Sequence, residues 1–140
     1  MSIVRTFLTV ALLATGGVAV AHSVENGRGE DRLTKIIDGR IAGKPVDCID
    51  LRRADSTEIV DGTAIVYRDG RTLYVNRPRI GRESLDSDDI LVTRTWSTPL
   101  CSIDTVRLID RGSNFQRGFV GLGEFVPYTK VNLSCDNRLI

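Results

Sequence analysis

The chain has 140 residues but a single histidine, His22, near its N-terminus. A thiol nucleophile needs a neighbouring imidazole or another cation to lower its pKa, so the sequence excludes an internal Cys–His catalytic pair. Cysteine is also scarce: Cys48, Cys101 and Cys135 lie 53 and 34 residues apart. Because zinc sites use ligands about two to four residues apart, or clustered histidines, we predict no metal site and no cofactor.

Neither sign of charge dominates, with 19 Lys and Arg against 18 Asp and Glu. A net charge close to zero gives no electrostatic basis for binding nucleic acid or an anionic membrane surface. Long apolar runs are absent after Val20. We therefore predict no partner among nucleic acids and no membrane span once the N-terminal segment has been removed.

The N-terminal segment has the three parts of a secretory signal peptide. Arg5 supplies the positive charge, Thr6 to Val20 is apolar or small, and Ala19-Val20-Ala21 is a small-x-small cleavage motif. The sequence thus predicts a signal peptide over 1–21 and a periplasmic or secreted product. The polar segment 22–29 that follows is expected to be a flexible leader.

A helix is predicted over 30–42. Its apolar residues recur at helical spacing and form one stripe, made of Leu33, Ile36, Ile37 and Ile41. Glu30 at the start suits the positive end of the helix dipole. Gly43 and Pro45 are expected to end the helix, because neither residue favours its continuation. The stripe is expected to lie on one face of a sheet.

After the helix the hydrophobic pattern changes to the period of two that is typical of strands. Asp61-Gly62 and Asp69-Gly70 separate three strand-like segments and predict successive hairpins. The expected strands are 46–51, 57–60, 63–67, 71–76, 90–95 and 119–128, with one more, "TVRLID", within 101–110. This tight spacing leaves no room for crossover helices, so the fold class is mainly β (α+β): one N-terminal helix followed by a small antiparallel sheet or half-open β-barrel. The single domain is predicted over 30–130, with a tail over 131–140.

Four short motifs occur in order along the chain: Gly-Lys-Pro-x-x-Cys-Ile at 43–49, Tyr-x-Asn-Arg at 74–77, Leu-Cys-x-x-Asp at 100–104 and Leu-Gly-x-Phe-x-Pro at 122–127. In this order, over about Arg32 to Lys130, the chain resembles a family of uncharacterised secreted proteins from Gram-negative bacteria, a domain of unknown function. The resemblance supports the architecture and the export. It implies no chemistry, because the family has no assigned activity.

The three cysteines are candidates for a disulfide, the default in an oxidising compartment. The alternatives are a Cys48–Cys101 pair, a Cys101–Cys135 pair, or Cys48 as a buried free thiol. Members of the resembling family carry further cysteines at two places where this chain has 80–82 and 120–121. If those pair with each other, the resemblance favours Cys48–Cys101. Cys135 would then be spare and could link two chains into a dimer.

Two groups of side chains are candidates for ligand binding or acid–base chemistry. The possible ligand-binding residues are Trp96, Arg77, Arg79 and Arg82. Of the other aromatics, Tyr67, Tyr74, Phe119 and Phe125 are expected to be packing residues. The acidic run of Asp86, Asp88 and Asp89 could hold a catalytic carboxylate pair, but this composition is more typical of a solvated turn.

No catalytic residue is assigned, and the sequence favours a non-enzymatic envelope protein with a binding or structural role, whose partner is an unknown envelope protein or a small ligand. The alternative is a small periplasmic hydrolase or a thiol-redox protein. A binding module should present an exposed aromatic–arginine patch and no perturbed carboxylates. An enzyme should hold two titratable groups with opposed pKa shifts in one pocket. A thiol protein should expose Cys48 or Cys101 beside Lys or Arg.

Overall fold

The structure is a computed structural model that describes residues 21–95 and 98–130, with side chains from residue 27. The predicted signal peptide, apart from Ala21, lies outside the described residues, as do Trp96 and the tail with Cys135. Within the described ranges, none of the helices is long and apolar enough to cross a membrane.

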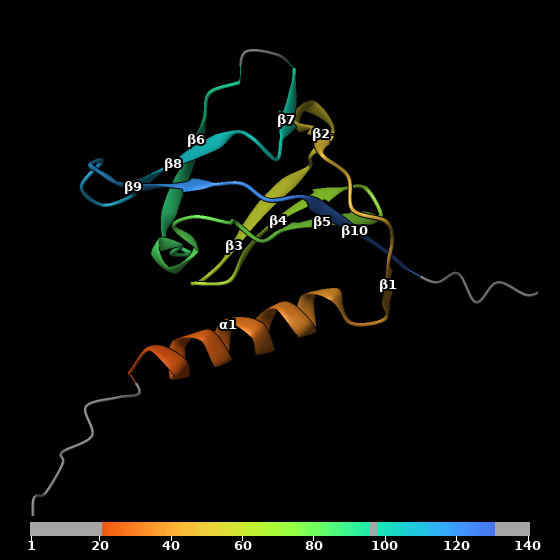
Figure 1. The fold of residues 1–140 in the computed structure, drawn as a ribbon, viewed down its shortest axis with the longest axis horizontal. Coiled ribbons are helices and arrows are strands. Elements are labelled where there is room, and N and C mark those ends of the chain that lie inside the picture. Colours follow the sequence, from red (N-terminus) through yellow and green to blue (C-terminus); the bar gives the residue numbers. More distant parts are fainter. Residues whose placement is uncertain (1–20, 96–97, 131–140) are drawn as a thin grey trace, which may run out of the picture.

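The fold is mainly β with one α-helix in the described part of the chain, as predicted (Figure 1). The elements in chain order are α1 (Ala21–Ile37), β1 (Arg40–Ala42), β2 (Cys48–Asp50), the 3₁₀ turn η1 (Leu51–Arg53), β3 (Ser56–Val60), β4 (Ala64–Asp69), β5 (Thr72–Asn76), the 3₁₀ turn η2 (Arg82–Ser84), β6 (Asp89–Thr93), β7 (Pro99–Cys101), β8 (Thr105–Asp110), β9 (Gln116–Gly121) and β10 (Phe125–Lys130). The strands form three antiparallel sheets, in the orders β1-β10-β5-β4-β3, β2-β7 and β6-β8-β9, and none closes into a barrel.

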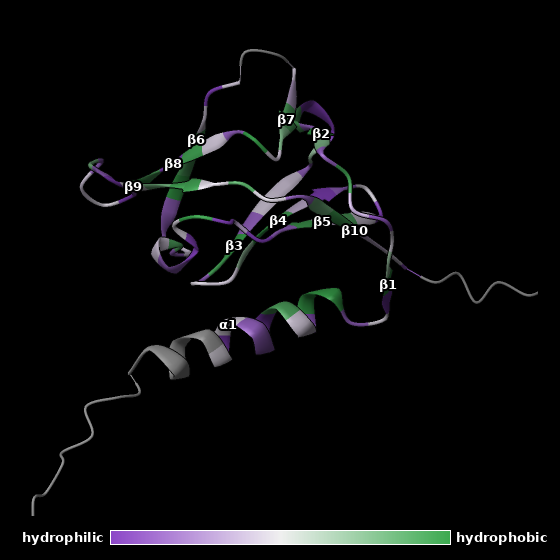
Figure 2. Cartoon of the chain, viewed as in Figure 1, coloured by the Kyte–Doolittle hydropathy of each residue, from purple (hydrophilic) through white to green (hydrophobic). Residues whose placement is uncertain are grey.

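The five-stranded sheet is the middle layer between α1 and the two smaller sheets (Figure 1). Alternation along β4 shows the arrangement. Ala64 and Val66 belong to the core that faces α1, whereas Ile65 and Tyr67 belong to the core that faces the small sheets. Since both faces are covered, β4 is buried over 64–67. Figure 2 shows the hydrophobic residues of α1 in the last turns of the helix, on the side of this sheet.

The two Asp-Gly turns form the predicted hairpins. Gly62 and Gly70 have φ values of 57° and 54°, in the left-handed region that glycine adopts without steric cost. They connect β3, β4 and β5 into an antiparallel meander. The sequence prediction of these three strands is confirmed.

The bounds of the helix differ from the prediction at both ends. The helix begins at Ala21, so it includes 22–29, which we expected to be a flexible leader. It ends at Ile37, because Gly39 takes the left-handed conformation (φ 66°) that commonly follows a helix C-terminus. Ile41 therefore lies on the edge strand β1, where it is 60% exposed, and is not part of the buried stripe.

The helix packs on the sheet through Leu33, which is buried, and through Ile36 and Ile37. A close approach at Gly29 accompanies this packing. A side chain there would overlap the hydroxyl of Thr63 and the carbonyl oxygen of Asp61, so only glycine fits. The predicted apolar stripe is thus confirmed except for its last residue.

The C-terminal half of the sheet structure was only partly predicted. The segment 119–128, expected as one strand, is divided into β9 and β10, which belong to different sheets. The strand β7 was not predicted. A register shift between Leu108 and Ile109 leaves Arg117 as an extra residue in β9, which is a β-bulge. Bulges redirect side chains. This one lies at Arg117, whose side chain contacts Asp86 and Asp89.

Candidate functional site

A disulfide joins Cys48 to Cys101 across the β2–β7 pair. The two residues are direct partners in the antiparallel register, with their Cα atoms 4.0 Å apart. This is the pairing that the family resemblance implied. Cys48 is exposed, whereas the neighbouring Ile49 and Leu100 are buried in the core below. The disulfide therefore lies at the surface and holds a short strand pair that covers the core.

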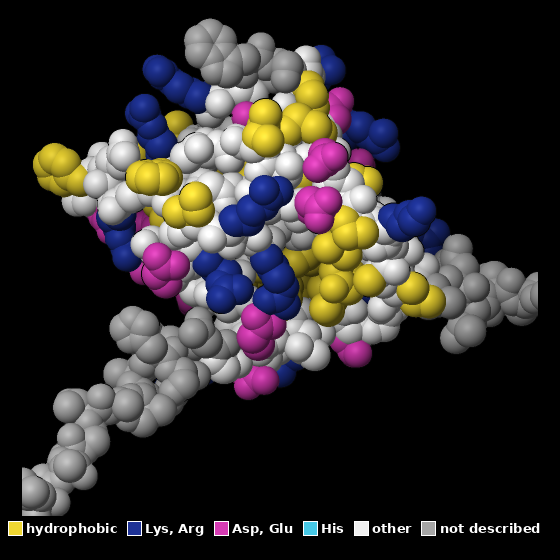
Figure 3. Space-filling model, viewed as in Figure 1, with side chains coloured by type: hydrophobic (Ala, Val, Ile, Leu, Met, Phe, Trp, Pro, Cys, Tyr) yellow, Lys and Arg dark blue, Asp and Glu magenta, His cyan; other side chains and the backbone are white. Residues whose placement is uncertain are grey.

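The outer face of the three-stranded sheet carries exposed apolar and basic side chains. We call this surface the outer patch; its residues are Ile90, Val92, Arg94, Ile103, Arg107 and Phe119. The alternation of β6, β8 and β9 explains it, because Leu91, Val106 and Val120 point to the core and their neighbours point outward. In Figure 3, hydrophobic (yellow) and basic (dark blue) side chains lie close together in the region of β8 and β9.

The centre of the outer patch is one row across the three strands, formed by Val92, Arg107 and Phe119 in register. Val92 is 40% exposed and Phe119 is 55% exposed, although we expected Phe119 to be a packing residue. The row and its neighbours line a depression of about 540 Å³. The side chains of Arg94 and Arg107 form no ion pair or hydrogen bond with another described residue.

On the edge of the same sheet, the bulged Arg117 connects two carboxylates. Its Nη1 atom lies 2.9 Å from Asp86 Oδ2 and 3.2 Å from Asp89 Oδ1. The backbone N–H of Asp88 and then Arg117 hold the pKa of Asp86 below its usual value, whereas burial raises the pKa of Asp89. The expected solvated turn is therefore wrong for Asp89, which is only 4% exposed.

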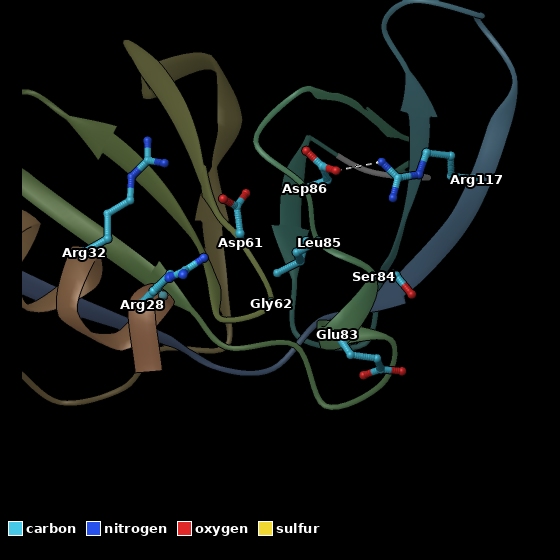
Figure 4. A pocket seen from close by; sticks show the side chains of 10 residues that line it. Arg28, Arg32, Asp61, Gly62, Glu83, Ser84, Leu85, Asp86 and Arg117 are labelled. Carbon is cyan, nitrogen blue, oxygen red and sulfur yellow. Dashed lines mark hydrogen bonds and ion pairs between the residues drawn. The ribbon is translucent and has the colours of Figure 1, made fainter. Parts of the chain in front are cut away.

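A cavity of about 440 Å³ lies beside this cluster, between the helix and the small sheet (Figure 4). Arg28 and Arg32 of α1 line one side, and Asp86 with Arg117 lines the other. Most of these charges are already engaged: Arg32 pairs with Glu58 at 3.0 Å, and Asp86 pairs with Arg117. The cavity therefore mixes both signs of charge and presents no single-sign site.

A second hollow, of about 750 Å³, lies between two edge strands that have no further strand partner, β3 and β6. We call it the edge groove. Tyr67 and Asp89 both line it, and both are almost fully buried, at 2% and 4% exposed. Tyr67 Oη and Asp89 Oδ2 are the buried side-chain polar atoms of the described residues that have no hydrogen-bond partner. Each such atom costs about 1–3 kcal/mol, so native proteins keep few of them.

The candidate ligand-binding residues from the sequence lie elsewhere. Arg77 donates two hydrogen bonds to the carboxylate of Glu30 on α1, and this ion pair lowers the pKa of Glu30. Arg79 and Arg82 are exposed near the same loop. None of the three lies on the outer patch or lines the edge groove. Their role in binding stays a prediction, and that of Trp96 falls outside the described residues.

The structure adds residues that the sequence analysis did not select as site candidates, chiefly Arg107 and Tyr67. The alternation in "TVRLID" could have placed Arg107 on the face opposite Val106 and Leu108. Nothing in the sequence pattern could have paired Asp89 with Tyr67, since they lie in different sheets and meet only at the groove.

Comparison with known proteins adds no relative: no protein family, no curated protein and no solved structure matches this chain.

Proposed function

We propose that the protein is exported to the bacterial envelope and acts there as a non-enzymatic binding protein, with the outer patch as its docking surface. The observation that supports this best is the row of Val92, Arg107 and Phe119. An exposed apolar and aromatic surface, with arginine side chains that have no partner among the described residues, is typical of binding sites, where Arg and aromatic residues are enriched. An exposed aromatic–arginine patch was one of the two features expected of a binding module. The other, the absence of perturbed carboxylates, is wrong, because the pKa of Asp86 is lowered and that of Asp89 is raised.

The charges of the patch indicate what kind of partner fits. Arg107 stands at the centre of the row, so a symmetric contact between two copies would bring two guanidinium groups together. The acid that lines the depression, Asp104, already accepts a hydrogen bond from the backbone N–H of Cys101. A partner with acidic groups between apolar side chains would instead pair with Arg94 and Arg107. We therefore propose a heterologous envelope partner with an acidic and apolar contact surface.

Photo-crosslinking in the exporting cell tests this proposal. A photoreactive phenylalanine analogue at position 119 should give one discrete crosslinked product, identifiable by mass spectrometry. The same analogue at Ile41, an exposed position on the five-stranded sheet, is the matched control and should give none. Arg107→Glu should remove the product. Equal crosslinking from positions 41 and 119, or a product that survives Arg107→Glu, would refute the outer patch as the docking surface.

Export itself is tested by the intact mass of the protein recovered from the envelope fraction. We expect a chain that starts at His22, with one disulfide and one free thiol. The free thiol would be Cys135, which we propose can link two chains. A covalent dimer that disappears both with reductant and in Cys135→Ser supports this link, whereas a dimer that persists in either case contradicts it.

A thiol-redox protein is the second candidate, because Cys48 is exposed and shares a small cavity with Arg53. The reduction potential of the disulfide distinguishes the two functions. A potential below about −300 mV fits a structural disulfide, and a value near those of the disulfide oxidoreductases would favour the redox role.

Hydrolysis has less support. The two carboxyl groups with opposed pKa shifts, Asp86 and Asp89, line different hollows, so they do not form one acid–base pair around a substrate. Within the edge groove, burial raises the pKa of both Asp89 and Tyr67, which keeps the phenol neutral.

A further inference from the structure

The edge groove lies along the free edges of two strands rather than over one face of a sheet. Three consecutive residues of β3, 57–59, line it, and so do three consecutive residues of β6, 89–91. Successive side chains of a strand point to opposite faces, so a hollow that contacts consecutive residues adjoins the edge where the backbone groups lie. Among the described residues, β3 and β6 each pair with one strand only. The groove is therefore bordered by two unpaired strand edges.

The free edge of β6 carries the backbone groups of Leu91 and Thr93. At the end of β8, the N–H of Asp110 donates to the carbonyl of the residue before β9, at 2.9 Å. Backbone groups alternate between the two edges of an antiparallel strand, so the odd-numbered residues of β8 direct theirs to β6. Their partners in the register are Ile90 and Val92. Leu91 and Thr93 consequently direct their N–H and C=O groups to the free edge, where no described residue bonds them.

This edge has little of the protection that exposed edges usually carry. Natural proteins guard a free edge with charged side chains, proline or a bulge, because such an edge pairs readily with other chains. β3 has Glu58 at its centre, whereas 90–93 of β6 is Ile-Leu-Val-Thr, without a charge, a proline or a glycine. Its β-branched residues also favour an extended backbone. Of the two edges, β6 is therefore the one that suits an added strand.

The charges at the two ends of this edge indicate which segment fits. Arg94 follows β6 directly, and its side chain has no partner among the described residues. At the other end, Arg111 donates to the backbone carbonyl of Asp88 at 3.3 Å and has no ion-pair partner in the described part of the chain. The other arginine that lines the groove, Arg32, is already paired with Glu58. An extended segment with an acidic group at each end would meet the two uncompensated charges.

From this geometry we infer that the edge groove binds an extended segment of another protein, which adds to β6 as a fourth strand of the small sheet. The segment has apolar side chains at alternate positions, which lie on Ile59 and Leu91, and an acidic residue at each end. Its backbone bonds to the N–H and C=O groups of Leu91 and Thr93, a mode of recognition in which main-chain hydrogen bonds supply the affinity. The inference does not depend on the outer patch, which lies on the face of the same sheet.

Two synthetic peptides test this inference with the ¹⁵N-labelled full chain. The peptide Glu-Val-Thr-Val-Thr-Val-Glu, blocked at both ends, has the required alternation and charges, and the same peptide with Lys in place of Glu is the control. We expect the acidic peptide to bind with a dissociation constant below about 1 mM and the Lys peptide at least about tenfold more weakly. At saturation, hydrogen exchange of the Leu91 and Thr93 amides should slow at least about fivefold, while Ile90 and Val92, which bond to β8, should change little.

A proline at position 93 tests the backbone contact. Thr93→Pro removes an N–H that faces the free edge, where proline is tolerated, so the variant should fold but bind the acidic peptide at least about fivefold more weakly. Thr93→Val keeps the N–H and nearly the same shape; it is the matched control and should bind as the parent does. Equal binding by the two variants would show that the peptide does not use the backbone of β6.

A charge swap tests the two arginines without a change to the backbone. Arg94→Glu combined with Arg111→Glu should reverse the preference, so that the Lys peptide binds at least about tenfold more tightly than the acidic one. Both arginines are at the surface, and the dispersion of the amide spectrum shows that the variant is folded.

Four further results would overturn the inference. If neither peptide slows exchange at Leu91, no strand adds to β6. If protection appears at 57–59 instead, the strand adds to β3. If the charge swap leaves the preference unchanged, the arginines do not select the segment. If the Leu91 amide is already protected without peptide, and loses this protection on dilution or when the chain is ended at Lys130, the edge belongs to a second copy or to the tail of this chain.

Discussion

Removal of the Cys48–Cys101 disulfide should lower the stability of this protein substantially. The test is the double substitution Cys48→Ser with Cys101→Ser, made in a Cys135→Ser background so that no stray thiol can form a new link. Serine nearly preserves the volume at both positions, and Cys48 is exposed, so the main loss is the covalent link itself.

The size of the effect follows from the chain that the link closes. The two cysteines are 53 residues apart in sequence. In the chain-entropy description, a loop of this length restricts the unfolded state by about 14 cal/mol/K, or about 4 kcal/mol at 25 °C. Measured losses fall around 2–4 kcal/mol, which is a large part of the roughly 5–15 kcal/mol that a domain has in total.

Urea unfolding of the two proteins measures the difference. With a slope of about 2 kcal/mol/M, a loss of this size lowers the midpoint by about 1–2 M. The slope itself should rise, because the unfolded chain without the link exposes more surface. Reduction of the parent protein should reproduce the same shift without any substitution.

A midpoint within about 0.3 M of the parent would refute this reasoning. It would mean that the β2–β7 ladder and the burial of Ile49 and Leu100 already fix this strand pair, or that the unfolded chain is compact enough for the link to restrict it little.

Three further substitutions test the packing and charge described above. Tyr67→Phe removes a buried hydroxyl that has no partner, so thermal unfolding should show a gain of up to about 1 kcal/mol, and a loss would mean that the hydroxyl has a structural partner. Asn76→Ala removes the side chain that bonds both the carbonyl and the N–H of Gly123, at 2.6 and 3.2 Å; urea unfolding should show a loss of about 2–4 kcal/mol, and less than 1 kcal/mol would contradict this role. The lowered pKa of Glu30 means that its pairing with Arg77 stabilises the protein above the ordinary value of 4.5, and that this contribution is lost as the pH falls through the folded value. Because both side chains are about half exposed, Glu30→Gln should cost less than about 1 kcal/mol at pH 7, and stability curves of variant and parent should converge in acid; a constant gap down to pH 2 would contradict the linkage.

Local signals in the sequence were sufficient to predict the meander of β3, β4 and β5. The Asp-Gly pairs at 61–62 and 69–70 predicted the turns, since glycine there adopts a positive φ, and the strands between them followed. The helix was recognised from its apolar spacing. Its end was misplaced because Ile41 fits the helical period, while the backbone at Gly39 had already left the helix.

The candidate sites were harder to predict, for a physical reason. Whether Phe119 packs or faces solvent depends on which sheet β9 joins, and that depends on contacts between segments far apart in the sequence. Asp89 belongs to an acidic run that favours a solvated turn, but the bulge at Arg117 supplies a partner that makes its burial tolerable. Neither the bulge nor the partner has a sequence signature of its own.

The sequence by itself determined the elements: the helix, the hairpins at the Asp-Gly turns, the antiparallel class and the supply of cysteines for a disulfide. These depend on the backbone preferences of a few residues and on the periodicity of apolar ones, which act over short distances. Only the tertiary structure decided the division into three sheets, the outer patch and the edge groove with its two unsatisfied atoms. Those features arise where Tyr67 and Asp89, or Val92, Arg107 and Phe119, are brought together from separate strands, and long-range packing alone sets which strands meet.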